Sequence, residues 1–285
     1  MKTYLKSAVF LLTGVLAVSC GSKPAATEPV EEAPVQDEKT ITLSDGTTTL
    51  TWVKDNQGER LMNRELFSDA PDSLIEQLGV QEGLPSSVST FVMHADGEWI
   101  LFDAGLGPKA GGQLLAGLEE MGLTPDSISY LYITHYHGDH IGGMLDAEGK
   151  PVFSKSKVYA GAVEHKAWME MPEDKNEQQR ATMEAYKDQL TFFEFGDTLP
   201  HGVVAMEAVG HTPGHAVFQK ENLLVIGDLM HGAALQYEHP EYSVNFDMDK
   251  AQAAVSRQKI LKYAQDNKLV MAGMHLPEPA FINPE

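Results

Sequence analysis

The chain has 285 residues, of which 42% are hydrophobic and 22% charged, a composition ordinary for a globular protein. Single domains of about 200–250 residues are common, so the length alone does not require two. The formal net charge of −20 argues against nucleic acid as a partner, because contacts to phosphates need clusters of Lys and Arg.

The first residues have the pattern of an export signal. Two lysines precede an apolar run over residues 8–18, which is too short for a bilayer span of about 20 residues. The small residues before Cys20 resemble the processing site of a bacterial lipoprotein. We therefore predict that residues 1–19 are a lipoprotein signal peptide. The alternative is a plain secretory signal with an incidental cysteine.

Residues 20–39 have the composition of a flexible tether, with spaced prolines and few apolar side chains. In this interpretation a lipid on Cys20 holds the protein at a membrane. The location would be the periplasm, the outer membrane or the cell surface. Because Cys20 is the only cysteine, we expect no disulfide in the folded part.

Residues 40–285 show no internal repeat and no second linker, and we predict one domain. Strands are expected at 89–94 and 99–103, joined by an Asp96-Gly97 turn. A helix at 114–121 and a buried strand at 129–134 follow. The composition then favours helices at 162–171 and 177–190.

The second half of the domain begins with expected strands at 203–209 and 223–226. Asp249 has the position of a helix cap, and we predict a helix from there to about residue 266. A last strand is expected at 269–272. The strands come in two batches, each followed by helices, which indicates a layered α/β sandwich with the sheets inside.

Four metal-ligating side chains follow the buried strand at 129–134. They are His135, His137, Asp139 and His140, and Gly138 leaves room for a tight turn between the two pairs. A single histidine is more often an ordinary core or surface residue, but this spacing directly after an apolar strand indicates metal binding. Imidazole and carboxylate without thiolate suit zinc and its neighbours.

Three more candidate ligands stand at the ends of other predicted strands. His211 follows one strand, Asp228 ends the next, and His275 follows the last. Ligands from separate strand ends can converge on one rim of an α/β sheet. His215 lies beyond a Pro-Gly turn, and we expect it to support that turn rather than bind metal.

These motifs resemble the metallo-β-lactamase fold superfamily over about residues 85–276. The resemblance rests on residues 134–140, 211–215, Gly227-Asp228 and His275, which occur in the order of the family. It implies a four-layer αββα sandwich. It also implies two divalent metal ions, with zinc favoured and manganese, iron or cobalt as alternatives. The metal ligands implied by the resemblance are His135, His137 and His211 for one ion, Asp139, His140 and His275 for the other, and Asp228 bridging both.

Further motifs, among them residues 102–105, 132–135 and 234–237, are similar to the methyl parathion hydrolase and lactonase-like branch. The resemblance implies a hydrolase in which a metal-bridged hydroxide attacks an ester, lactone or phosphotriester of a small molecule. Asp139 and Asp228 would be the catalytic carboxylates. The acyl-homoserine lactonases of the superfamily carry Tyr where this chain has His231, which argues against their chemistry.

Several other residues have weaker assignments. Asp103 and Thr134 are expected to orient metal-bound imidazoles, although a strand-end cap explains them equally well. Five side chains are candidates for contact with the substrate: Tyr136, Trp168, Met230, His231 and Tyr237. For each of them ordinary core packing is the rival explanation. For His231 a position on a loop without a function is a further alternative.

Two other functions compete with this hydrolase. One is a metallo-β-lactamase acting on β-lactams, which Asp228 argues against because those enzymes generally lack it. The other is a lipid-tethered binding protein whose metals are structural. The sequence predicts neither the physiological substrate nor the oligomeric state.

Overall fold

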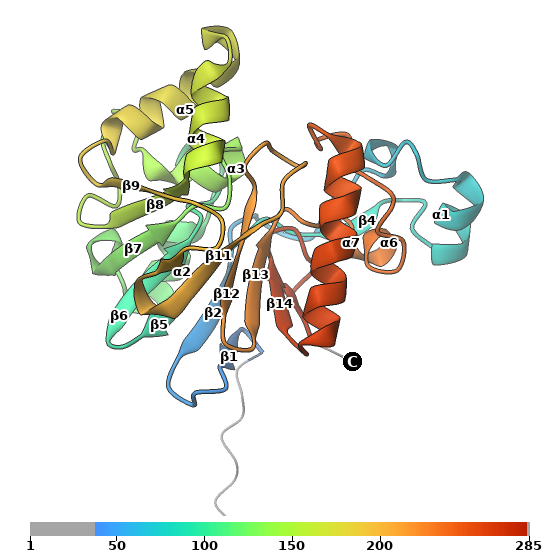
Figure 1. Cartoon of the computed structure of the whole chain (residues 1–285), viewed down its shortest axis with the longest axis horizontal. Helices are drawn as coiled ribbons and strands as arrows, with labels where there is room; N and C mark the ends of the chain where they lie inside the picture. Colours follow the sequence, from blue (N-terminus) through green and yellow to red (C-terminus); the bar gives the residue numbers. More distant parts are fainter. Residues whose placement is uncertain (1–37, 284–285) are drawn as a thin grey trace, which may run out of the picture. The chain divides into compact units, whose positions relative to one another are not determined.

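Two β-sheets packed face to face form the centre of the structure, a computed structural model that describes residues 38–283 (Figure 1). The first sheet has seven strands, in the order β1 (Thr40–Thr42), β2 (Thr49–Lys54), β5 (Ser89–Ala95), β6 (Glu98–Phe102), β7 (Ile128–Tyr132), β8 (Lys157–Gly161) and β9 (Leu190–Phe193). The second has six, in the order β10 (Thr198–Leu199), β11 (Val203–Glu207), β12 (Ala216–Lys220), β13 (Leu223–Gly227), β14 (Val270–Gly273) and β15 (Phe281–Ile282).

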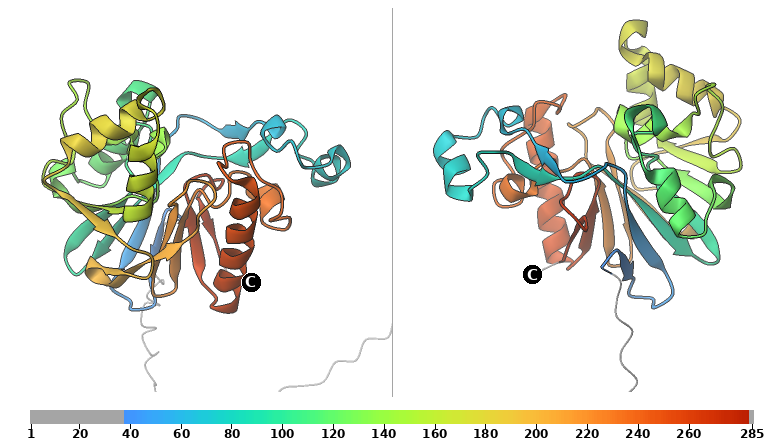
Figure 2. Two further views of the ribbon diagram at one scale, coloured as in Figure 1. Left: turned by 45° about the horizontal axis from the view of Figure 1, so that its top comes forward. Right: turned by 180° about the vertical axis from the view of Figure 1, so that it is seen from behind.

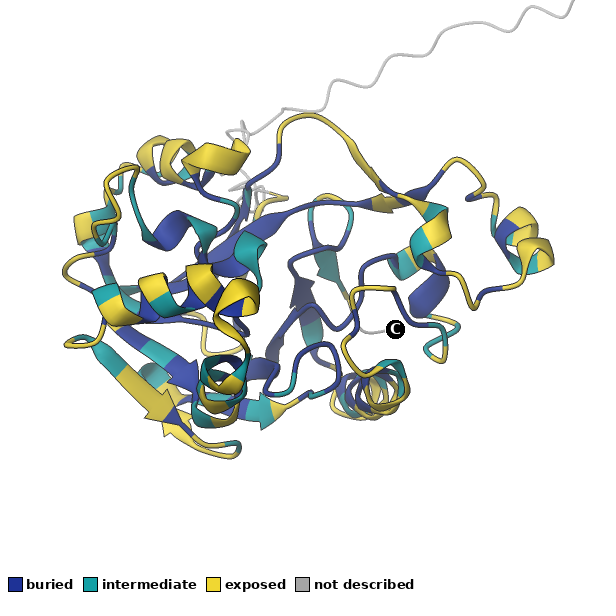
Figure 3. Cartoon of the chain, turned by 90° about the horizontal axis from the view of Figure 1, so that it is seen from above, coloured by how far each residue is buried: buried dark blue, intermediate teal, exposed yellow. Residues whose placement is uncertain are grey.

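Helices cover the outer face of each sheet, which completes the predicted four-layer αββα sandwich (Figure 1). On the first sheet lie α2 (Leu114–Glu120), α3 (Gly138–Ile141), α4 (Ala162–Glu170) and α5 (Glu173–Ala185). On the second lies α7 (Lys250–Asp266). Figure 3 shows most central strands in dark blue and the outward helix faces in yellow.

Alternation along the first sheet sorts its side chains into two cores. Phe91 and Met93 of β5 face the space between the sheets, whereas Val92 faces the helices. In the same way Phe102 of β6 belongs to the first core and Leu101 to the second. Successive strand residues point to opposite faces, so a sheet buried on both sides must be apolar at nearly every position.

A small lobe stands beside the sandwich. It contains β3 (Arg60–Met62), β4 (Leu84–Ser86), α1 (Asp72–Leu78) and α6 (Ala233–Gln236). Its own core joins residues far apart in sequence, including Phe67, Ile75 and Leu235. Figure 2 shows the lobe projecting from the sandwich on the side of α7. The segments of this lobe are short, and none of them was among the elements predicted from the sequence.

The predicted elements agree with the structure where local signals are strong. Asp96 and Gly97 connect β5 to β6 with φ of 51° and 81°, the left-handed values that a two-residue hairpin turn needs. The Asp249 carboxylate accepts a hydrogen bond of 3.0 Å from the Gln252 amide at the start of α7. The helix expected at 177–190 instead spans Glu173–Ala185, and Leu190 already begins β9.

The described residues 38–283 exclude the predicted signal peptide 1–19, Cys20 and nearly all of the predicted tether 20–39. None of the helices in the described part is long and apolar enough to cross a membrane.

Candidate metal centre

The candidate ligands meet at one edge of the sandwich, where several strands end. His135 follows β7, His211 follows β11, Asp228 follows β13 and His275 follows β14. β13 and β14 are parallel, and β11 runs in the same direction because β12 is antiparallel to both of its neighbours. Their carboxyl ends therefore bring side chains from distant parts of the sequence to one place.

Three imidazoles form the first group. His137 Nδ1 lies 3.0 Å from His135 Nε2 and 2.9 Å from His211 Nε2, and the remaining pair is 3.2 Å apart. Two nitrogens bound to one tetrahedral zinc ion, with bonds of about 2.0–2.1 Å, are about 3.3 Å apart. The spacing therefore fits a single cation held by all three side chains.

Asp228 lies between this group and a second one. Its Oδ2 is 3.2 Å from His211 Nε2 and 3.1 Å from His275 Nε2, and its Oδ1 is 3.0 Å from His140 Nε2. Asp139 completes the second group, with Oδ2 3.4 Å from His275 Nε2. Within each of these two groups one ligand atom per residue lies within 4.8 Å of all the others.

Buried polar atoms without hydrogen bonds mark the space between the groups. His140 Nε2 and Asp228 Oδ1 have no hydrogen-bond partner among residues 38–283, and both side chains are buried. Leaving such atoms unpaired is costly, so each needs an explanation. A cation between His140 and Asp228 satisfies both, and the residues present therefore fit a metal ion.

Asp103 and Thr134 hold two of the imidazoles from behind. The Asp103 carboxylate accepts hydrogen bonds from the Thr134 amide and hydroxyl, at 2.8 and 2.7 Å, and its Oδ2 lies 2.7 Å from His140 Nδ1. Thr134 Oγ1 lies 3.0 Å from His135 Nδ1. These contacts leave the Nε2 atoms directed at the metal position, the arrangement expected of residues that orient ligands.

Asp247 does the same for His211, and the sequence analysis missed it. Its Oδ1 lies 2.9 Å from His211 Nδ1. The buried Arg257 donates to Asp247 Oδ2 at 3.1 Å and to the Leu229 carbonyl at 2.7 Å. The Arg257 guanidinium thus holds in place both Asp247, which contacts His211, and the loop after Asp228.

Glu164 of α4 is a second residue that the sequence analysis missed. Its Oε1 accepts hydrogen bonds from the Tyr136 amide at 2.9 Å and Trp168 Nε1 at 2.6 Å. Its Oε2 accepts from the Thr212 hydroxyl and the Gly214 amide, both at 2.8 Å. One buried carboxylate therefore joins the two loops that carry the first group of histidines.

His215 supports the turn that precedes Asp228. Its Nδ1 lies 3.0 Å from the Ala208 carbonyl and its Nε2 accepts from the Asp228 amide at 3.0 Å. Gly227 has φ of 51°, and a Cβ there would lie 2.5 Å from His215 Nε2. Only glycine allows this close approach.

Burial and neighbouring charges shift the pKa values of the ligand side chains in different directions. Burial lowers the pKa of His135 well below its usual value and that of His137 to about 3. Burial opposes protonation of His275 as well, but the Asp228 carboxylate raises the pKa of His275 to about 10. The imidazoles of His140 and His275 hold the pKa of Asp228 well below its usual range against the effect of burial. The cluster therefore carries an ionised carboxylate at its centre.

A family model described as the metallo-beta-lactamase superfamily matches residues 83–275, which include every candidate ligand. The chain belongs to the metallo-beta-lactamase superfamily. Solved structures of similar fold include AidC, a dizinc quorum-quenching lactonase, and the hydrolase AbOPH in the beta lactamase superfamily. Their TM-scores are 0.78 and 0.76, each at 24% identity over 86% of this chain, and the match covers 92% and 91% of their own chains.

A curated relative is the lactamase-like protein aptB of Emericella nidulans, 28% identical over 211 residues. The match covers 68% of this chain and 60% of the Emericella protein. The family model places this chain in the metallo-beta-lactamase superfamily, and the structures of similar fold include a lactonase and a hydrolase. At 24% identity these solved structures show that the fold is shared, and they do not identify the substrate of this chain.

In this member of the superfamily the two groups of candidate ligands face a cavity of about 330 Å³. Besides candidate ligands, its lining contains Arg60, Met62, His231 and Phe246. His231 Nε2 lies 3.1 Å from Asp228 Oδ2, and its ring stacks on His275 at 4.8 Å. Of the five predicted substrate-facing residues, His231 alone is among those that line this cavity.

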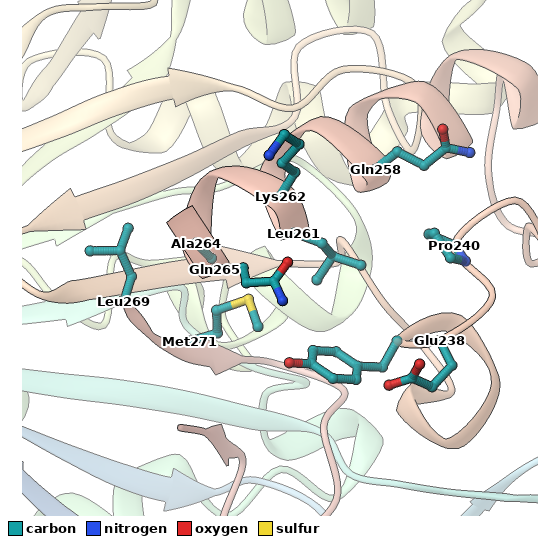
Figure 4. A pocket seen from close by; sticks show the side chains of 10 residues that line it. Glu238, Pro240, Gln258, Leu261, Lys262, Ala264, Gln265, Leu269 and Met271 are labelled. Carbon is teal, nitrogen blue, oxygen red and sulfur yellow. The ribbon is translucent and has the colours of Figure 1, made fainter. Parts of the chain in front are cut away.

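The structure places the other four predicted substrate-facing residues elsewhere. Tyr136 and Trp168 belong to the core between the first sheet and its helices, and Met230 to the core between the sheets. Tyr237 lines a separate cavity of about 430 Å³ along α7, shown in Figure 4, which contains none of the candidate ligands. Core packing, the rival explanation from sequence, describes the first three.

Proposed function

We propose that this chain is a two-metal hydrolase that cleaves an ester, lactone or phosphotriester bond of a small molecule. The observation that carries the proposal is the position of Asp228, whose two oxygens face the two ligand groups at the floor of one cavity. Carboxylate bridges of this kind are typical of sites that hold two ions about 3.5–4 Å apart.

Zinc is the metal that the donor set favours, with manganese, iron and cobalt as alternatives. When bound, the two ions would lower the pKa of a shared water and polarise the oxygen of the scissile group. His135, His137 and His211 would hold one ion, and Asp139, His140 and His275 the other. Asp139 lines the cavity as an ionised carboxylate, so it can accept a hydrogen bond from the attacking water.

The test is metal quantification followed by a turnover screen. The purified domain, from Thr40 onward, would be loaded with zinc and assayed on lactones, including acyl-homoserine lactones, and on aryl esters, phosphotriesters and β-lactams. We expect two ions per chain and activity on at least one of the first three classes. Activity confined to β-lactams would favour a true β-lactamase, and two bound ions without any turnover would favour the binding protein.

We expect metal loading to depend on pH, and more steeply for one group than for the other. In the metal-free protein the pKa values of His140 and His275 are raised, mainly by Asp228 against the effect of burial. Both imidazoles are then protonated at neutral pH and must release protons when a metal binds. In the other group His135 and His137 are already neutral, and only the pKa of His211 is raised.

Each proton released makes the apparent affinity rise about tenfold per pH unit. Lowering the pH from about 8 to about 6 should therefore release zinc from the second group first, with a plateau at one ion per chain. The groups that face His275 are Asp228 at 3.1 Å, Asp139 at 3.4 Å and the His231 ring at 4.8 Å. Simultaneous loss of both ions, or loading independent of pH, would contradict this assignment.

The lipid anchor on Cys20 remains part of the proposal, as does a location at a bacterial membrane. In this proposal the protein meets its small-molecule substrate outside the cytoplasm and does not bind nucleic acid. Expression of the full chain in a bacterium tests the anchor. The wild type should partition into the membrane fraction, whereas Cys20→Ser should be found in the soluble fraction.

A further inference from the structure

Arg60 is a cation at the mouth of the metal cavity that lacks an acidic partner. Among the described residues that line the cavity it is the only Lys or Arg. Its side chain makes no ion pair or hydrogen bond within residues 38–283. By contrast Arg64, in the same lobe, pairs with Asp72 at 2.7 Å. In a chain with 41 acidic and 21 basic residues, most cations can find a carboxylate nearby.

Hydrogen bonds fix Arg60 close to the metal centre. Arg60 pairs with Ser86 across the β3–β4 ladder. The Ser86 hydroxyl donates to the His275 carbonyl at 3.0 Å, and the Ser87 carbonyl lies 2.8 Å from His275 Nδ1. The strand that carries Arg60 is therefore anchored to the loop of a candidate ligand.

The alternation of side chains along β3 directs Arg60 and Met62 toward the cavity. Arg60 and Met62 share one face of the strand and both line the cavity, while Leu61 points the other way and is 56% exposed. Met62 is buried in the core of the lobe, which holds this face in place. Apart from the candidate ligands, the lining of the cavity thus contains one cation together with the apolar Met62 and Phe246.

We propose that Arg60 selects the substrate by binding a carboxylate that the substrate carries in addition to the bond that is cleaved. The proposal rests on the proposed function, because it names the substrate class of the same site. The planar guanidinium matches a carboxylate with two parallel hydrogen bonds. Because the protein is otherwise strongly acidic, a cation in the cavity lining adds an attraction for a second carboxylate of the substrate.

The family likeness does not assign this role. Arg60 and Met62 precede residues 83–275, the part that matches the superfamily. The cavity of about 330 Å³ lies near the lower end of the range for ligand sites, about 300–1,000 Å³. The substrate that fits is accordingly a small acid with one hydrolysable bond and a short apolar part.

A binding experiment tests the proposal without turnover. The probes are succinate, glutarate and adipate, each compared with its monoamide, which keeps one carboxylate for the metals and replaces the other by a neutral group of equal size. Titration calorimetry on the zinc-loaded protein should show at least one diacid binding about tenfold more tightly than its monoamide, the effect of a charge-assisted hydrogen bond at an exposed site.

Variants assign that preference to one side chain. Arg60→Gln should remove it, Arg60→Lys should restore part of it, and Arg64→Gln, a matched control in the same lobe, should leave it unchanged. Equal binding of every diacid and its monoamide by the wild type would overturn the proposal. So would a preference that persists in Arg60→Gln.

A hydrolysis experiment then separates this proposal from the function of the site. The substrates are para-nitrophenyl esters of the same diacids and of the corresponding monoamides. Arg60→Gln should raise KM about tenfold for the charged esters and leave kcat and the neutral esters unchanged. If the wild type cleaves neither these esters nor any lactone, aryl ester or phosphotriester of the screen, the proposed function is contradicted, while the binding experiment still decides the role of Arg60.

Discussion

Asp228→Ala should lose at least one metal ion per chain and nearly all turnover. Asp228 is the only carboxylate that lies within 3.2 Å of imidazole nitrogens from both groups in the described chain. Changing a residue that merely orients a ligand costs about 10–100-fold in affinity or activity, so loss of the shared ligand should cost more than about a hundredfold. Metal content and kcat/KM on the best substrate of the screen measure the effect.

Asp188→Ala serves as the control for Asp228→Ala, because Asp188 is an exposed aspartate distant from the cavity lining. It should retain both ions and full activity. In the metal-free protein Asp228→Asn should also lower the pKa of His275 from about 10, which histidine NMR would detect. Full activity of Asp228→Ala with two ions retained would remove the basis of the proposed function.

Glu164→Ala should destabilise the protein by about 3 kcal/mol and weaken metal binding. The change leaves four buried donors without their acceptor: one in the loop of His135, two in the loop of His211, and Trp168 Nε1 on the same helix. An unpaired buried donor costs about 1–3 kcal/mol, and water entering the space can satisfy part of the set. A loss of this size is a large fraction of the total stability of about 5–15 kcal/mol.

Urea denaturation of the metal-free protein measures the stability effect of Glu164→Ala, and zinc competition measures the affinity. We expect the affinity to fall about 10–100-fold, because the loops of His135 and His211 lose their common support. Glu170→Ala, an exposed residue of the same helix, should change stability by less than about 0.5 kcal/mol. If Glu164→Ala is as stable as Glu170→Ala, the four hydrogen bonds contribute nothing net.

Features that depend on a few neighbouring residues could be predicted from the sequence. The Asp96-Gly97 turn and the Asp249 cap are local signals, and both appear where they are expected. The order of strands and helices predicted the layered α/β sandwich, and the ligand motifs carried the resemblance to the superfamily, which the match over residues 83–275 confirms. The lobe around β3 was missed, since its core combines short segments that are weak signals separately.

Residues that support the metal centre through distant contacts could not be predicted in this way. Glu164 reaches Thr212, 48 positions along the chain, and Asp247 reaches His211 across 36. No spacing rule relates such pairs. Tyr136 and Trp168 show a second limit of prediction from sequence. Both were candidates for contact with the substrate, but an aromatic side chain can point into the core as readily as into a cavity, and both belong to the core.

By itself, the sequence determined which side chains are able to bind a metal, because ligand chemistry belongs to residue types and their spacing after a strand is local. It also determined the fold class, since alternation and turn residues act over a few positions. Only the tertiary structure decided what holds each imidazole in place and that Arg60 lines the cavity. These depend on strands that end together in space, and that proximity is a property of the packed sheets.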